Sequence, residues 1–316
     1  MLFTTRNVRP RKLATLAVGL ALSLSGCAEG PEDLATETAT SPLTSSTFVD
    51  SSGKLFVQIK TCDWTAPFDH RNTTSCSVDP GFVLVGGGAE TSGTDALLFS
   101  SYPGSDLKTW FAGSKDHLVG AIHKLRAYAI GLKMSGVREA ELRSVMSYVV
   151  ETQFGSRPTG KPQVPLGHVL VGGGATITYT GAGGLLTESY PDPGVGRWRA
   201  AAKDHGVADT SLVMRTVAVG IPVCVNGVCL NAGLVTKQSP TTFSLPGVHT
   251  VQKTIPPGAV LASVGGRAQY DTNIGRLLSK MTPFFDNAPG FTIVSKDHVF
   301  GEDGITTGYA VTLTGR

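Results

Sequence analysis

The tripeptide Lys-Asp-His occurs three times in this chain of 316 residues, each time five residues after an aromatic residue. The three copies use three of the seven histidines. Carboxylate, imidazole and ammonium groups together suit the hydroxyl groups of a sugar or an acidic ligand, and three equivalent shallow sites would bind a multivalent surface with avidity. The candidate ligand-binding residues are therefore Lys115, Asp116, His117, Lys203, Asp204, His205, Lys296, Asp297 and His298.

A structural interpretation of the same triplets stays open. Each aspartate would end a strand and accept backbone N–H bonds from the next turn, with the histidine as a local partner and the lysine in solvent. Structural residues are copied as faithfully as functional ones when a unit is triplicated, so repetition does not separate the two interpretations.

Catalysis and metal binding by the triplets are weaker alternatives. The chain has no G-x-S-x-G and no H-E-x-x-H motif, and no obvious pair of unmatched carboxylates. A hydrolase site would have to arise in one diverged copy, and the third copy is the place to look because Asp271, Glu302 and Asp303 lie there. We predict no metal and no cofactor.

The triplets belong to a longer repeated unit. GFVLVGGGA, ALLFSSYP, TWFAGSKDH and RAYAIGL recur as GHVLVGGGA, GLLTESYP, RWRAAAKDH and RTVAVGI, and then as VLASVGGRA, RLLSKMTP, FTIVSKDH and TGYAVTL. The first glycines of the GGG-like elements are matched as Gly86, Gly172 and Gly265. Copies that keep their order and spacing are copies of a structure, so we predict repeats at about 54–136, 137–222 and 223–316.

Each repeat consists of short segments rich in Val, Leu, Ala, Tyr and Thr between turn residues, which predicts strands. LFVQIKT, SYVVETQ and AGLVTKQ are the expected first strands of the three copies. The segment 137–146, VREAELRSVM, is either a short helix or the lead-in to a strand. The fold class is therefore all-β, with four or five antiparallel strands in each repeat.

Three such units favour closed threefold pseudosymmetry, because a single sheet would leave an apolar face and two edges unprotected. The layout of residues 54–316 resembles a β-prism, as found in plant and bacterial lectins and at the C-terminal end of some membrane-attack-type proteins. The resemblance implies three sheets as the faces of a prism. A three-bladed propeller-like assembly and three tandem small domains are the alternatives.

Glycine runs and aromatic residues are interpreted structurally. A phosphate-binding loop needs a helix after the glycines, whereas polar loop and strand follow here, so the GGG elements predict a sharp bend or close backbone approach near a prism axis. Trp110, Trp198 and Phe291 are expected in the core, with a sugar-stacking platform as the minor alternative.

The N-terminus predicts export. Four basic residues precede an uncharged apolar stretch, 13–25, which is too short for a membrane-spanning helix. The exit LSGC, ending at Cys27, resembles the lipobox of bacterial lipoproteins, which implies a signal peptide at 1–26, lipidation of Cys27 and a bacterial membrane anchor. Ala28 after it implies the outer membrane or the cell surface. An ordinary cleaved signal followed by a stray cysteine is the alternative.

The signal also explains the formal charge of +3, because basic and acidic residues nearly balance without it. A near-neutral body without a basic cluster argues against nucleic acid as a partner. Residues 27–53 are rich in Thr, Ser, Glu and Pro, which predicts a disordered tether between the anchor and a single domain at 54–316.

Four further cysteines fit an oxidising compartment. CVNGVC predicts a type I′ hairpin turn at Asn-Gly with Cys224 bonded to Cys229, and Cys62 is expected to pair with Cys76 across a polar loop. A zinc site would need further ligands that this motif lacks.

The sequence thus predicts an exported binding or adhesion lipoprotein of the bacterial envelope, with carbohydrate as the preferred ligand class. A glycan or an envelope protein is the expected partner, besides the membrane reached through the lipid anchor. The alternative is a structural or protein-interaction lipoprotein without a small ligand, and a hydrolase comes third.

Overall fold

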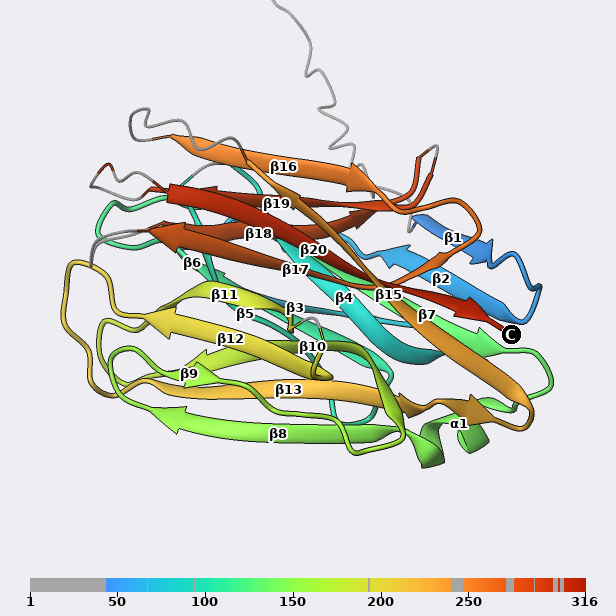
Figure 1. Ribbon diagram of the computed structural model, residues 1–316. Coiled ribbons are helices and arrows are strands. Elements are labelled where there is room, and N and C mark those ends of the chain that lie inside the picture. Colours follow the sequence, from blue (N-terminus) through green and yellow to red (C-terminus); the bar gives the residue numbers. More distant parts are fainter. Residues whose placement is uncertain are drawn as a thin grey trace, which may run out of the picture. The chain divides into compact units, whose positions relative to one another are not determined.

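The computed structural model describes residues 44–316, except 67, 94, 193, 240–246, 271–275, 287, 298–300 and 302–303. Cys27, the signal peptide and the first part of the tether, 27–43, therefore lie outside the described residues. The described chain forms antiparallel strands and one short helix (Figure 1).

Each repeat contributes six strands, which corrects the expected four or five. The first copy consists of β2 (Leu55–Thr61), β3 (Arg71–Ser77), β4 (Val83–Thr91), β5 (Leu97–Pro103), β6 (Thr109–Lys115) and β7 (Leu125–Met134). The second consists of β8 (Ser147–Phe154), β9 (Thr159–Gly160), β10 (His168–Thr178), β11 (Leu185–Asp192), β12 (Arg197–Lys203) and β13 (Val213–Pro222). The third consists of β15 (Val228–Gln238), β16 (Val248–Thr254), β17 (Val260–Tyr270), β18 (Leu277–Phe284), β19 (Gly290–Lys296) and β20 (Gly304–Gly315), preceded by the short β14 (Cys224–Val225).

The strands form three antiparallel sheets, in a β-prism-like arrangement. The strand orders are β1-β2-β7-β4-β18-β19-β16, β3-β6-β5-β10-β13-β8 and β14-β15-β20-β17-β11-β12-β9. Every sheet therefore joins three strands of one copy to three strands of another. No repeat closes a sheet alone. The strand that the sequence estimate left out in the first copy is the polar β3.

The predicted tether extends too far toward the domain. Its residues Thr44–Val49 form β1, which pairs with β2 along the register Thr44↔Thr61 to Val49↔Phe56. The composition of this segment is unfavourable for a core, but an edge strand gains its hydrogen bonds from the neighbouring strand. The uncertain segment at 137–146 contains a helix, α1 (Glu139–Val145), that leads directly into β8.

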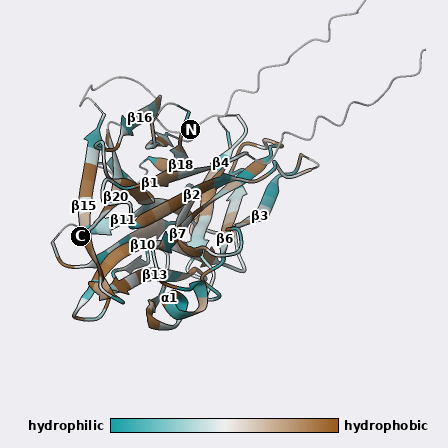
Figure 2. Cartoon of the chain, turned by 90° about the vertical axis from the view of Figure 1, so that its right-hand side faces the viewer, coloured by the Kyte–Doolittle hydropathy of each residue, from teal (hydrophilic) through white to brown (hydrophobic). Residues whose placement is uncertain are grey.

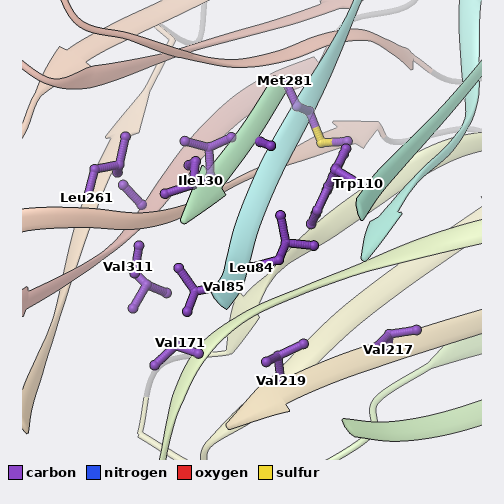
Figure 3. Close-up of a cluster of buried hydrophobic side chains, with 14 of the residues drawn as sticks. Leu84, Val85, Trp110, Ile130, Val171, Val217, Val219, Leu261, Met281 and Val311 are labelled. Carbon is purple, nitrogen blue, oxygen red and sulfur yellow. The ribbon is translucent and has the colours of Figure 1, made fainter. Parts of the chain in front are cut away.

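The glycine runs lie where strands from different copies approach each other. A Cβ on Gly86 would lie 2.3 Å from the carbonyl oxygen of Ala262, and one on Gly172 would lie 2.0 Å from that of Val85. The predicted close approach is therefore confirmed. Figure 3 shows apolar side chains from all three copies around this region, among them Val85, Val171 and Val311.

The third copy is aligned differently from the sequence expectation. Gly88 pairs with Tyr128 and Gly265 pairs with Tyr309, so these two glycines are equivalent. The sequence alignment had matched Gly265 with Gly86, two positions earlier. The bulges after Leu84 and Leu261 fall at matching places, so Ser263 and Val264 stand where the first copy has Gly86 and Gly87.

The aromatic positions are core residues, since Trp110, Trp198 and Phe291 are at most 2% exposed. The indole N–H groups donate to Ser101 and Ser189, at 3.1 and 3.0 Å. Burial of the rings rules out an aromatic platform for a sugar at these positions. Figure 2 shows hydrophobic colour along β2 and hydrophilic colour on the outer strand β3.

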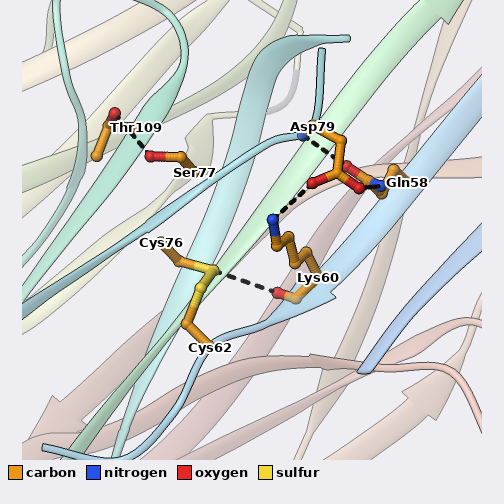
Figure 4. The surroundings of a disulfide bond; sticks show 7 residues. All are labelled: Gln58, Lys60, Cys62, Cys76, Ser77, Asp79 and Thr109. Atoms are coloured by element: carbon orange, nitrogen blue, oxygen red, sulfur yellow. Dashed lines mark hydrogen bonds and ion pairs between the residues drawn. A yellow bond between two sulfur atoms is a disulfide. The ribbon is translucent and has the colours of Figure 1, made fainter. Parts of the chain in front are cut away.

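Both predicted disulfides are present. Cys62 and Cys76 link the loop after β2 to β3, with Cα atoms 5.6 Å apart, beside the ion pair of Lys60 and Asp79 (Figure 4). Cys224 and Cys229 face each other across the hairpin. Its turn has positive φ at both Asn226 (46°) and Gly227 (79°), as a type I′ turn requires.

Candidate functional site at the Lys-Asp-His loops

The three Lys-Asp-His triplets lie at equivalent strand ends. Lys115, Lys203 and Lys296 are the last residues of β6, β12 and β19. Each pairs in register with a leucine at the start of the neighbouring strand, and these leucines are fully buried in one cluster: Leu97, Leu185 and Leu277. The strand ends of all three copies therefore converge on a shared apolar centre.

Two of the lysines, Lys115 and Lys296, bridge different copies. Lys115 Nζ donates to the carbonyl oxygen of Ala182 at 2.5 Å and lies 4.6 Å from the ring centroid of Tyr179, both in the second copy. Lys296 Nζ donates to Asp95 of the first copy at 3.0 Å. Ala182 and Asp95 lie in equivalent loops, between β10 and β11 and between β4 and β5. The corresponding loop of the third copy, 271–275, lies outside the described residues.

All three lysines are buried, which contradicts the expectation that they are in solvent. Lys115 and Lys296 are 6% exposed and Lys203 is 1% exposed. Burial, and then the nearby charge of Arg71, lower the pKa of Lys115 to about 8. Their burial and their bridging contacts fit an ammonium that ties one copy to the next better than one that meets a ligand.

The aspartates of the first two copies cap the loop that follows them. Asp116 accepts the N–H of Ala121 at 2.8 Å, and Asp204 accepts the N–H of Asp209 at 3.2 Å, five residues on in both cases. Asp116 also contacts His70 Nδ1 at 2.5 Å. Partial burial alone would raise the pKa of Asp116, but these hydrogen bonds and the charge of His70 hold it below its usual value.

Asp297 has a different environment in the third copy. One oxygen lies 2.9 Å from the guanidinium of Arg276, with both side chains almost fully buried, and the other accepts the N–H of Gly247 at 3.1 Å. The same triplet therefore keeps its place at the strand end while its partners change.

The histidines of the first two copies meet each other. His117 and His205 are 6% and 2% exposed, their ring centroids are 5.7 Å apart, and His117 Nε2 donates to the carbonyl oxygen of His205. The next residue has positive φ in both copies, 63° at Leu118 and 70° at Gly206, which turns the chain back sharply. His298 lies outside the described residues.

Sequence reasoning missed an exposed apolar patch on these loops. We define the loop-end patch as five large hydrophobic side chains that are 44–63% exposed: Phe68, Leu118, Val119, Ile122 and Val207. The segments adjoin, since Asp69 exchanges backbone hydrogen bonds with His123 and a Cβ on Gly206 would touch Leu118. The sequence signal was Leu-Val and Gly-Val after the triplets, which alone does not distinguish core from surface.

Polar groups border the patch. The His70 side chain is 62% exposed and lies against Asp116, which is 19% exposed. In the second copy, Asp209 accepts the N–H of Gly183 at 2.6 Å and two bonds from Ser211, of which the Ser211 hydroxyl bond contributes most to lowering the pKa of Asp209. These contacts fix the loops that carry the exposed side chains.

Among the described residues, no group of three or more His, Cys, Asp or Glu side chains has the arrangement of a metal site. Asp271, Glu302 and Asp303, the residues named for a diverged hydrolase site, lie outside the described part. No described helix combines the length and apolar content needed to cross a membrane.

A scan against protein-family models finds no match, and a search of curated proteins finds no relative of this chain. The fold and the loop geometry are therefore the basis of the functional argument. They belong to an all-β domain of three antiparallel sheets with two disulfides.

Proposed function

We propose that the protein is a surface-attached binding module of the cell envelope and that the loop-end patch is its binding surface. The observation that carries the proposal is the concentration of exposed Leu, Ile, Val and Phe side chains on adjoining loops. Contiguous exposed apolar surface on a folded domain is costly in water and marks interaction sites. Loops held by a rigid base are the usual carriers of such sites.

The buried triplets support this division of roles. Lys115 and His117 tie the first copy to the second, and Asp116 fixes the loop that carries Leu118 and Ile122. The triplet thus holds the binding loops in place, and the residues that follow it would contact a partner.

Carbohydrate remains the proposed ligand class, because the loop that carries an exposed ring also carries an exposed polar group. Phe68 is 52% exposed, and two residues later His70 forms the accessible pair with Asp116. An aromatic ring, a carboxylate and an imidazole on adjoining loops suit a sugar ring and its hydroxyl groups. The Lys124 ammonium lies 4.6 Å from the centroid of the Phe68 ring, so one face of this ring is available to a sugar. A protein of the envelope would instead use mainly the apolar side chains.

Attachment to the membrane is part of the proposal. The basic start, the apolar stretch and the sequence ending at Cys27 support export and lipidation. Radiolabelled palmitate should appear in the full chain expressed in a bacterium and should be absent from Cys27→Ser.

The binding surface is tested with the full chain carrying Cys27→Ser, labelled with a fluorophore, on a glycan array and on intact envelope preparations. Ile122→Ser combined with Val119→Ser should reduce binding at least about tenfold, because both side chains are exposed and would be buried by a partner. Leu166→Ser is the matched control, since Leu166 is 98% exposed but precedes β10 at the opposite end of the sheets.

A sugar hit that depends on His70 and Asp116 would identify the glycan class. Binding to envelopes without a sugar hit would favour a protein partner. Equal binding by the patch variant and the parent chain would remove the loop-end patch from consideration.

A further inference from the structure

The first strands of the first and third copies occupy equivalent positions. β2 pairs with β7 through Ile59↔Ile130, and β15 pairs with β20 through Leu234↔Val311, at matching places in the two units. Continuing the register matches Val57 with Ala232, and Thr61 with Thr236. The two strands differ in what lies on their outer edge.

The outer edge of β2 is covered by β1. The register places Phe48 opposite Val57, and Ser46 opposite Ile59. Val57 and Ile59 are fully buried. A short, uncharged and hydroxyl-rich segment of this chain is therefore accepted as an added strand at this position.

The outer edge of β15 has the same hydrogen-bonding groups turned outward. Cys229 exchanges both backbone bonds with Arg316, so the pairs of β15 with β20 alternate from there, and Ala232, Leu234 and Thr236 direct N–H and C=O away from β20. Two contacts agree with this assignment. Leu230, two residues earlier, donates outward to the carbonyl oxygen of Val223, and Lys253 reaches the outward carbonyl oxygen of Thr236.

No described strand covers this edge beyond the disulfide hairpin. β14 pairs only at Cys224 and Val225, and it is the last strand on that side of the sheet. All residues from Asn231 to Leu234 are exposed, in contrast with the buried Val57 and Ile59 of β2. β15 also lies at the margin of the domain beside β20 in the view of Figure 2.

We propose that the open edge of β15, from Ala232 to the N–H of Thr236, binds an extended segment of a partner protein as an added strand. The occupant resembles β1 in chemistry: uncharged over about six residues, rich in Ser and Thr, with a bulky apolar residue opposite Ala232. An unpaired edge binds through its backbone groups, and the side-chain pattern then selects the partner.

Charge further defines the partner. In the orientation of β1, the N-terminal end of the added strand would lie beside Thr236, where Lys237 is exposed and Lys253 donates to the Thr236 carbonyl. An acidic residue just before the strand would therefore be attracted to these two ammonium groups. This surface is separate from the loop-end patch, so each proposal can fail without the other.

The probe is a fluorescein-labelled peptide with the sequence of Thr44–Asp50 preceded by one glutamate, added to the full chain carrying Cys27→Ser. We expect saturable binding by fluorescence anisotropy and slower amide hydrogen exchange at Ala232, Leu234 and Thr236. Ala232→Pro should weaken binding at least about tenfold, because it removes only an outward N–H and leaves the bonds of Asn231 and Gly233 with β20 intact.

The controls separate this edge from the others. A peptide with Ser46→Pro should not bind, and Leu234→Pro is the second protein variant should Ala232→Pro impair folding. Slowed exchange at Val57 and Ile59 instead of β15 would mean exchange with β1 and would overturn the proposal. A concentration-dependent dimer that Ala232→Pro abolishes would also overturn the proposal, since a second copy of this chain would then pair with the edge of β15. Amide hydrogen exchange along β15 that stays unchanged at a saturating peptide concentration would overturn the proposal as well.

Discussion

We call a place where a strand of one repeat pairs with a strand of another repeat a seam. Two of these seams occupy equivalent positions in the fold, but one carries charged residues and the other does not. Where β4 of the first copy meets β18 of the third, Glu90 lies opposite Lys280 and forms an ion pair with it. Where β10 of the second copy meets β5 of the first, the equivalent pair is Thr176 and Ser100, which carry no charge.

The charged seam is also a network. Glu90, 7% exposed, accepts the hydroxyl bond of Tyr128, and Arg126 lies 3.8 Å away. Burial first, and then the charge of Glu90, raise the pKa of the Tyr128 hydroxyl, so it remains a donor. The backbone at these junctions therefore accommodates a charged or an uncharged pair of facing residues, provided that the two side chains are compatible with each other.

The largest effect is expected from breaking the charged seam on one side. Glu90→Thr leaves Lys280, Tyr128 and Arg126 without their shared carboxylate, so the free energy of unfolding should fall by about 3 kcal/mol. Adding Lys280→Ser gives this seam the Thr and Ser pair of the uncharged seam, and should recover more than half of the lost free energy of unfolding. Urea denaturation measures both variants. A double variant no more stable than the single one would show that the seams are not interchangeable.

Lys115, which also joins two copies, gives a prediction that depends on pH. Burial and the charge of Arg71 lower the pKa of Lys115 to about 8, whereas the pKa of a lysine in an unfolded chain is about 10.4. Below pH 8 the folded state holds a desolvated ammonium, and between these values the unfolded chain binds more protons, so this residue's contribution to stability rises with pH across that window.

Lys115→Met should therefore be close to wild type in stability at pH 7, and should lose about 1 to 2 kcal/mol relative to wild type as the pH rises to 10. Lys296→Met is the control, because that amine faces the carboxylate of Asp95 and its loss should cost stability at pH 7. A Lys115→Met difference that does not change with pH would contradict the assignment.

The smallest effect is expected at the third seam, where Glu188 and Arg267 form an ion pair at 2.8 Å. Their side chains are 22% and 34% exposed, so water screens the pair. Exchanging the two residues, Glu188→Arg with Arg267→Glu, should change the free energy of unfolding by less than about 1 kcal/mol. A loss near that of Glu90→Thr would place this seam with the buried network instead.

Sequence patterns were sufficient for local structure. Runs of strand-forming residues between turn residues located β2, β8 and β15, the Asn-Gly pair specified the hairpin between Cys224 and Cys229, and the repeat predicted three related units. These features depend on neighbours within a few residues, which a sequence contains directly.

The sequence did not predict which strands share a sheet. The local pattern of a six-stranded repeat is the same whether its strands form one sheet or are shared between two. Burial of Lys115 was missed for a similar reason: its carbonyl and aromatic partners lie in another copy. The sequence alone was sufficient for the order of the repeated elements, the hairpin turn, the two disulfides and the core aromatic residues. The pairing of strand edges, the burial of the lysines and the exposure of the loop side chains follow from the tertiary structure, since all three depend on contacts between copies.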